Sequence, residues 1–174
     1  MSYKLSGLLV ASALFCFPAA SQAGQSPVIT TQPQSQTAVA GSSVTFTVAA
    51  TGTTPLGFQW KFNGANLSGA TNLTLRLDNV QPVQAGTYSV RVSNPYGSAQ
   101  SSGAQLTVNV PALITNQPMS VATVAGATVT FSAGASGTAP IFYQWRYNGA
   151  PMAGATKSTL DPSVMRSTLV ASNS

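Results

Sequence analysis

The sequence predicts an all-β protein of antiparallel β-sandwich repeats, one complete and one incomplete toward the C-terminus. Three observations lead to this fold class. The phrase QWKFNGANLSGAT at 59–71 returns as QWRYNGAPMAGAT at 144–156. Apolar and polar residues alternate through several short segments, which is the pattern of a half-buried antiparallel strand. Turn signals rich in Gly, Asn and Pro separate these segments, and no stretch after residue 23 has a helical pattern.

Residues 1–23 have the features of a secretory signal peptide and are set apart from the fold. Lys4 gives a short positive region, an apolar run follows at 5–17, and Ser21 and Ala23 are the small residues of a cleavage site. The apolar run is shorter than the roughly 20 residues that a membrane-spanning helix needs. We therefore expect an exported protein, extracellular, at the cell surface or in the periplasm, with no transmembrane segment after cleavage.

The first repeat unit is expected at 24–110, with strands whose alternating apolar residues face the core. Asn63-Gly64 is a strong hairpin signal, and NPYG at 94–97 is a second turn signal between strands. The residues expected to point inward are Val44, Phe46, Val48, Leu73, Leu75, Leu77, Tyr88, Val90, Val92, Leu106, Val108 and Val110.

An internal repeat with an offset of 85 residues defines a second unit, which we expect at 111–160. Residues 29–75 and 114–160 align without a gap and are identical at 25 of 47 positions. The connection between the units is short and contains Pro111, so we expect consecutive units to form a semi-rigid rod.

After Leu160 the second unit departs from the first, and the remaining residues 161–174 read DPSVMRSTLVASNS. The repeat predicts a counterpart of AGTYSVRVSN (85–94), which is absent from this stretch. Without that strand, neighbouring strands would present unpaired backbone and exposed core. Three readings stay open: a truncated, frameshifted or partial chain of a longer protein; a divergent, disordered tail; and an incomplete sandwich that receives a strand from a partner.

The residues of the first unit resemble the immunoglobulin fold, in particular the I-set-like repeats of secreted and surface proteins of bacteria. Trp60 in FQWKF is similar to the buried tryptophan of the family's strand C. Tyr88 in AGTY is similar to its tyrosine corner, whose hydroxyl bonds to upstream backbone. The resemblance covers 28–110 fully and 113–160 in part.

Three positions depart from that family's pattern. Val48 and Val90 stand where the family often carries paired cysteines, and Gln84 stands where it has an aspartate. Two valines fill the same space with apolar surface and make folding independent of oxidation, and the counterpart of Val48 in the second unit is the smaller Ala133. The resemblance and the repeat together imply a structural core that includes Val48, Trp60, Tyr88, Val90, Ala133 and Trp145.

Composition excludes most kinds of site chemistry. Charged residues make up 5% of the chain, His is absent, and the two acidic residues are Asp78 and Asp161, which fall in different parts of the chain. Metal ligands, paired carboxylates and an oriented base for a serine nucleophile therefore cannot be assembled in one unit. We expect no enzyme, no cofactor and no metal site. The net charge of +5 comes from scattered cations, so we expect no nucleic-acid partner.

These features predict a non-catalytic module that acts as a structural spacer or as an adhesion or interaction unit, within a larger surface protein. Its partner would be a protein or a surface polysaccharide, and the oligomeric state stays open. Tyr96, at the tip of the 94–97 turn, is the best candidate for an exposed aromatic contact. The alternative is a carbohydrate- or polymer-binding accessory that tethers a secreted enzyme encoded downstream to its substrate.

Overall fold

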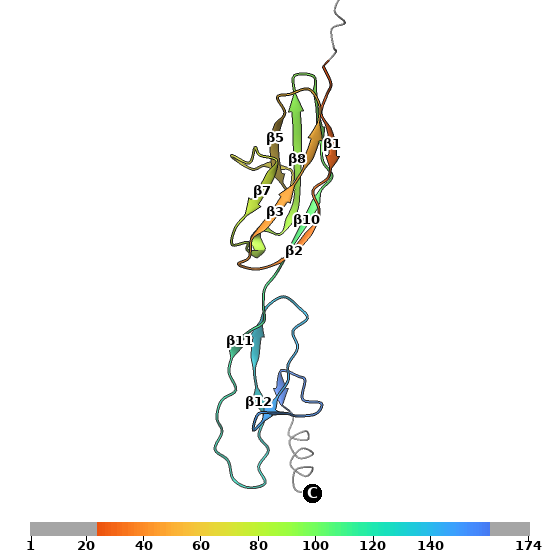
Figure 1. Ribbon diagram of the computed structural model, residues 1–174. Helices are drawn as coiled ribbons and strands as arrows, with labels where there is room; N and C mark the ends of the chain where they lie inside the picture. The colour runs from red at the N-terminus through yellow and green to blue at the C-terminus, as the bar shows by residue number, and fades with distance from the viewer. Residues whose placement is uncertain (1–23, 161–174) are drawn as a thin grey trace, which may run out of the picture.

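A computed structural model describes residues 24–160, so the signal peptide expected at 1–23 and the tail expected at 161–174 lie outside the described residues. The described chain forms two β units that follow one another (Figure 1). The first contains strands β1 to β10 with one short 3-10 helix, η1, and the second contains strands β11 to β16.

The strands of the first unit are short, and β8 is the longest of them. Their bounds are β1 Val28–Thr31, β2 Gln36–Val39, β3 Val44–Thr47, β4 Ala49–Thr51, β5 Gly57–Phe62, β6 Ala65–Asn66, β7 Thr74–Leu77, η1 Pro82–Gln84, β8 Gly86–Asn94, β9 Gly97–Gln100 and β10 Ala104–Asn109. The second unit contains β11 Leu113–Asn116, β12 Phe131–Ser132, β13 Gly134–Ser136, β14 Arg146–Tyr147, β15 Ala150–Pro151 and β16 Thr159–Leu160.

Two layers make up the first unit. One is a six-stranded sheet in the order β2-β10-β8-β5-β6, with β9 paired to β8. Its pairs are antiparallel except for β2 and β10, which run parallel. The other layer consists of the pairs β1–β4 and β3–β7. Because only Val48 separates β3 from β4, the two pairs continue along the same stretch of chain.

The core lies between these layers, where the alternating residues of both meet. Phe46 of β3 stacks on Tyr88 of β8 with 4.9 Å between ring centroids, and it lies 6.2 Å from the ring of Trp60. Interior aromatic contacts of this kind add to the area that they bury. The buried core residues are Val44, Phe46, Val48, Trp60, Leu75, Val80, Tyr88, Val90, Ala104, Leu106 and Val108.

Two of the residues expected to point inward do not lie in the core. Leu73 is 51% exposed because the chain bends at Asn72 and Leu73, before β7 begins at Thr74. Val110 is also exposed, since β10 ends at Asn109 and the chain then passes to the second unit. The alternation of apolar and polar residues in the sequence therefore extends beyond the ends of strands β7 and β10.

The second unit repeats pairs of the first with the same register. The pair β11–β13 reproduces β1–β4, including its irregularity, and β12–β16 reproduces part of β3–β7. The hairpin β14–β15 reproduces β5–β6, and Asn148 of its turn has a positive φ like Asn63. Within the described residues there is no counterpart of β8, β9 or β10, so one side of the second unit is open.

Reciprocal hydrogen bonds fasten the connection between the units. The backbone N–H of Val110 donates to Oγ1 of Thr138 at 2.7 Å, and the N–H of Thr138 donates to the carbonyl of Val110 at 2.9 Å. The same two bonds join Gln25 and Thr53 at the start of the first unit. Val110 therefore lies at the end of the first unit and is also hydrogen-bonded to the second unit.

Candidate interaction surfaces

In the first unit, the residues expected to form the structural core lie between the layers. Trp60 and Val90 are 0% exposed, and Val48 and Tyr88 are also buried. The indole Nε1 of Trp60 donates to the carbonyl of Asn72 at 2.9 Å, so its one polar atom is satisfied. These four residues hold the two layers together and are not accessible to a partner.

Tyr88 fastens the start of β8 to the preceding helix η1. Its hydroxyl donates to the carbonyl of Gln84 at 2.9 Å, which is the geometry of a tyrosine corner. Burial raises the pKa of this phenol, because the phenolate would lose its hydration. The side-chain oxygen of Gln84 accepts from the backbone N–H of Gln81 at 2.8 Å and so caps η1. The aspartate that the family has at this position could accept the same hydrogen bond.

The core positions of the second unit are less covered. Ala133 and Trp145 are half-buried, whereas their counterparts in the first unit are buried. Trp145 nevertheless keeps the hydrogen bond of its counterpart, because its Nε1 donates to the carbonyl of Lys157 at 2.9 Å. It packs with Phe131 against a small buried cluster of Met152, Ala155 and Leu160.

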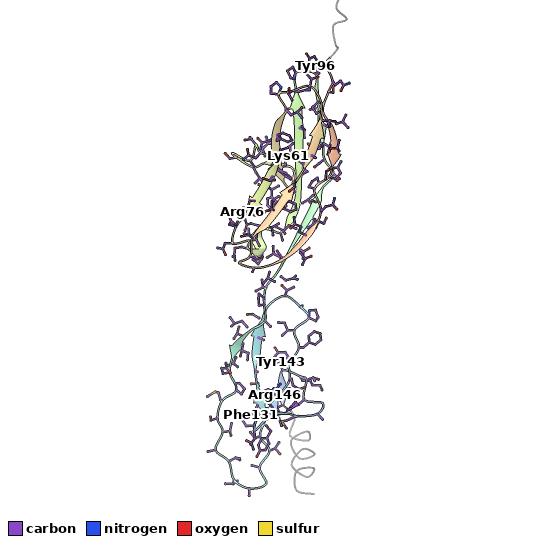
Figure 2. All side chains as sticks on the ribbon, in the orientation of Figure 1. Lys61, Arg76, Tyr96, Phe131, Tyr143 and Arg146 are labelled. Atoms are coloured by element: carbon purple, nitrogen blue, oxygen red, sulfur yellow. The ribbon has the colours of Figure 1, made fainter. Side chains whose placement is uncertain are left out.

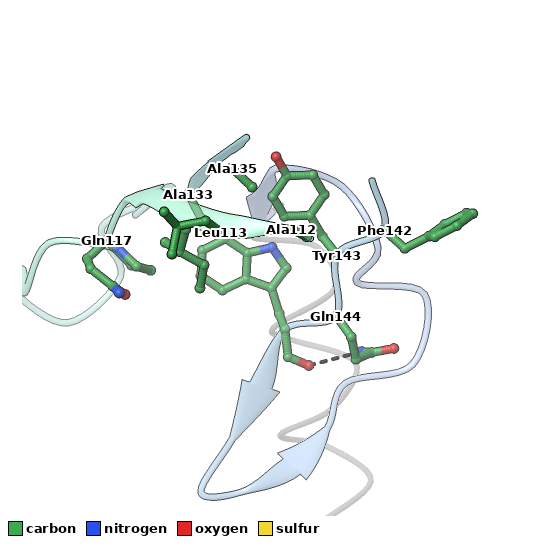
Figure 3. Close-up of a pocket in the computed structure, with 11 residues that line it drawn as sticks. Ala112, Leu113, Gln117, Ala133, Ala135, Phe142, Tyr143 and Gln144 are labelled. Carbon is green, nitrogen blue, oxygen red and sulfur yellow. Dashed lines mark hydrogen bonds between the residues drawn. The ribbon is translucent and has the colours of Figure 1, made fainter. Parts of the chain in front are cut away.

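An apolar groove of about 290 Å³ lies on the open side of the second unit. Figure 3 shows Leu113, Ala133 and Tyr143 around it, whereas the ring of Phe142 points away and is 85% exposed. Gln144 is held beside the groove, since its amide donates to the carbonyls of Trp145 and Met152 at 3.0 and 2.8 Å. The lining residues carry no charged group, so the groove suits apolar side chains.

A second, polar hollow of about 380 Å³ lies on the outward face of β5 and β8 in the first unit. Register places Gln59 opposite Arg91, and Lys61 lies one step further along the same face of β5. Figure 2 shows Lys61 on this unit, at a distance from Arg76. The residues that line the hollow are Gly57, Phe58, Gln59, Lys61, Asn66, Arg91 and Ser93.

Tyr96 lies at the turn between β8 and β9, at the end of the first unit far from the second (Figure 2). It is 54% exposed. Its backbone is fixed, because its N–H donates to Oδ1 of Asn94 at 2.9 Å and its carbonyl accepts from the hydroxyl of Ser26 at 2.8 Å. A Cβ at Gly24 would lie 2.0 Å from the ring of Tyr96, so this glycine packs directly on the aromatic face.

Charges within residues 24–160 form one ion pair and no cluster of metal-ligand residues. Arg76 and Asp78, both exposed on the first unit, lie 2.8 Å apart. The hydrogen bond from Arg76, together with one from the hydroxyl of Ser43, lowers the pKa of Asp78. The other acid, Asp161, lies outside the described residues, so no pair of carboxylates can be placed.

The sequence analysis proposed Tyr96 as a contact, and the structure places this residue at an exposed turn, but the sequence analysis missed the polar hollow. Lys61 and Arg91 are 30 positions apart in the sequence, and only the pairing of β5 with β8 brings them to one face. Alternation indicates that both point outward, but it does not specify the register. In the part of the chain that the structure describes, no helix has the length and apolar character needed to cross a membrane.

Comparisons with known proteins agree with this architecture. Residues 26–94 match the family model described as immunoglobulin domain. Leucine-rich repeats and immunoglobulin-like domains protein 3 of Mus musculus is 32% identical over 142 residues, which are 71% of this chain and 13% of that protein. The human cell adhesion molecule DSCAM is 30% identical over 132 residues, which are 68% of this chain and 7% of that protein.

A bacterial enzyme is among the similar proteins. Endoglucanase C of Cellulomonas fimi is 31% identical over 144 residues, which cover 77% of this chain and 13% of the enzyme. The chain thus spans about an eighth or less of the length of these three relatives.

Solved tandems of immunoglobulin domains have the same fold. A titin I-band fragment superposes with a TM-score of 0.62 at 21% identity, covering 78% of this chain and 53% of the fragment. Domains 1–4 of Sidekick-1 give a TM-score of 0.61 at 22% identity, covering 81% of this chain and 42% of theirs. The chain is therefore an all-β protein with the immunoglobulin-like fold, and its residues 26–94 match the model of the immunoglobulin domain family.

Proposed function

We propose that this chain is an exported, non-catalytic immunoglobulin-like repeat module that serves as an adhesion or interaction unit of a larger surface protein. The observation that carries the proposal is the groove of the second unit, an open apolar surface whose lining has no acid, base or cation. Such a surface can bind a partner, and its lining offers no carboxylate, imidazole or amine for acid–base chemistry.

Two further findings support a role at the surface. The relatives include a cell adhesion molecule, and the tandem arrangement with a hydrogen-bonded connection suits a spacer. The bacterial origin proposed here agrees with the likeness to a Cellulomonas protein, and the I-set subtype proposed here agrees with the tyrosine corner formed by Tyr88. Export itself predicts that the purified secreted protein begins at Gly24, which Edman or mass-spectrometric N-terminal sequencing measures.

The adhesion role can be tested with beads that carry the full chain after export. We expect the beads to be retained on surfaces coated with extracellular proteins and not on insoluble cellulose or chitin. Retention on neither kind of surface would leave only the spacer role. The DNA downstream of the gene gives an independent check, because further repeats of this 85-residue unit are expected in a longer surface protein.

A polymer-binding accessory role is the second candidate, and the polar hollow of the first unit favours it. Two cations, Lys61 and Arg91, lie there with amide and hydroxyl side chains and with Phe58, a combination that can contact sugar hydroxyls and acidic groups. The likeness to an endoglucanase points the same way. Retention of the beads on polysaccharide, abolished by Lys61→Ala with Arg91→Ala, would favour this role over protein adhesion.

A further inference from the structure

The groove of the second unit has a counterpart in the first unit, and there a strand fills it. In the first unit β8 lies along β5 with Val90 opposite Trp60 and Val92 opposite Phe58. Both valines are 0% exposed, so this strand closes the core. At the offset of 85, the equivalents of Trp60 and Phe58 are Trp145 and Tyr143, which line the open groove.

The aromatic neighbours of the strand are also present in the second unit. In the first unit the ring of Tyr88 lies between Phe46 and Phe62, with 4.9 Å to each centroid. Their equivalents are Phe131, which is only partly buried, and Tyr147, which is 51% exposed. The second unit thus retains both walls of an aromatic slot.

The polar edge of the groove is conserved between the two units in the same way. In the first unit the side-chain oxygen of Gln32 accepts from the N–H and the hydroxyl of Ser102, at 2.9 and 3.1 Å. Ser102 belongs to the turn that joins β9 to β10. The equivalent of Gln32 is Gln117, which lines the groove. An amide acceptor is therefore in place for a segment that follows the added strand, as Ser102 follows β8 in the first unit.

Within residues 24–160, the backbone beside the groove is unpaired on one side. The N–H and the carbonyl of Trp145 are bonded to Ala155 and Met152 on the hairpin side, as those of Trp60 are bonded to Ala70 and Leu67. On the other side, where β5 pairs with β8, no backbone hydrogen bond joins 141–144 to a strand within residues 24–160. This edge can therefore accept a strand by β-augmentation.

We propose that this groove binds an extended β-strand of a separate partner protein, in the register that β8 has in the first unit. The strand would place an aromatic residue opposite Tyr147, and small apolar residues opposite Trp145 and Tyr143. Its pattern is that of the Tyr-x-Val-x-Val sequence of 88–92, with polar residues between. This inference rests on the proposed interaction role and specifies its partner as a protein strand.

A partner is favoured over a second copy because the strands of this pattern in the described chain are already paired on both sides. Strand β8 lies between β5 and β10 together with β9, and β10 lies between β8 and β2. The sequence at 161–174 contains no Tyr-x-Val-x-Val pattern. Residues 24–174 therefore supply no free strand with that pattern, and a partner protein is the source that we propose.

The inference can be tested by adding a capped peptide with the sequence of 85–94 to the full chain purified after export. Acrylamide quenching of tryptophan fluorescence is the main readout, because Trp60 is 0% exposed and Trp145 accounts for the accessible indole. We expect saturable protection of Trp145, and slower amide hydrogen exchange at 141–147, at peptide concentrations below about 1 mM. No protection up to that concentration overturns the proposal.

Two controls test specificity. A peptide in which serine replaces Val90 and Val92 keeps the polar face but lacks the side chains that enter the groove, so we expect at least about tenfold weaker binding. In the chain, Ala133→Asp introduces a charge into the groove and should abolish binding, whereas Ser136→Asp on exposed β13 should not. Equal binding of both peptides overturns the proposal even if Ala133→Asp fails to fold.

The remaining outcomes separate this inference from the proposed function. Full protection of Trp145 before any peptide is added would mean that the chain fills its own groove, and the proposal would be wrong. If the beads are retained on proteins although the peptide does not bind, the adhesion role is supported, but strand binding in the groove does not explain it. Peptide binding without bead retention would support the groove and contradict adhesion to the proteins used.

Discussion

At the scale of single residues, the hydroxyl of Tyr88 provides the sharpest test of the first unit. Tyr88→Phe keeps the ring stacked on Phe46 but removes the hydrogen bond to the carbonyl of Gln84. We expect the free energy of unfolding to fall by about 1 kcal/mol. Urea unfolding followed by Trp60 fluorescence measures this change. Tyr96→Phe is the matched control, since within residues 24–160 the hydroxyl of this exposed residue forms no hydrogen bond. Equal effects of the two variants would contradict the role assigned to the Tyr88 hydroxyl.

The ionisable residues predict stability that changes little between about pH 5 and 8, because the chain has no histidine. The pKa of Asp78 is lowered from 3.8 in the folded protein. Its contribution to the free energy of unfolding is therefore complete above pH 3.8 and is lost as the pH falls through the lower folded pKa. The pKa of Tyr88 is raised from 10.0 in the folded protein. Its contribution to the free energy of unfolding is therefore complete below pH 10.0 and is lost as the pH rises through the raised folded pKa. Urea midpoints measured across this range would contradict the prediction if they changed between pH 5 and 8.

At the scale of strands, the sequence predicted those elements in which every second residue meets the opposite layer. Strands β3, β8 and β10 follow that rule, so alternation alone located them. Leu73 violates it because the chain bends before β7, and alternation carries no information about a bend. The open side of the second unit follows from the missing counterpart of 85–94, whereas the hollow at Lys61 and Arg91 depends on strand register, which the pattern leaves undetermined.

The two layers of the first unit can be joined by a covalent link between their central strands. Val48 follows β3 and Val90 lies in β8, and both belong to the buried core cluster. We expect Val48→Cys with Val90→Cys to form a disulfide that raises the free energy of unfolding by about 2–4 kcal/mol. Thiol titration and urea unfolding with and without reductant measure it. Either single variant is the control and should be slightly destabilised, and free thiols in the oxidised double variant would show that the positions do not meet.

At the scale of the whole molecule, the repeat preserves contacts as well as residues. The indole bonds of Trp60 and Trp145 reach carbonyls at equivalent positions, and the bonds of Gln25 with Thr53 recur between Val110 and Thr138. Within residues 24–160 the second unit therefore has the local hydrogen bonds of the fold without a counterpart of β8, the strand that covers Trp60 in the first unit. The stability of the second unit should depend more on what covers its open side than on its own strand pairs, because hairpins without a closed core are only marginally stable in water.

The hydroxyl of Thr138 controls how tightly the chain is held where one unit passes into the next. Thr138→Val removes the acceptor for the N–H of Val110, whereas Thr138→Ser retains it. We expect amide exchange at Val110 to accelerate by about fivefold in the valine variant, since the loss of one hydrogen bond is worth roughly 1 kcal/mol, and to remain near its original rate in the serine variant. Hydrogen exchange followed by NMR measures both. Unchanged exchange in Thr138→Val would mean that the reverse bond, from the N–H of Thr138 to the carbonyl of Val110, holds the connection by itself.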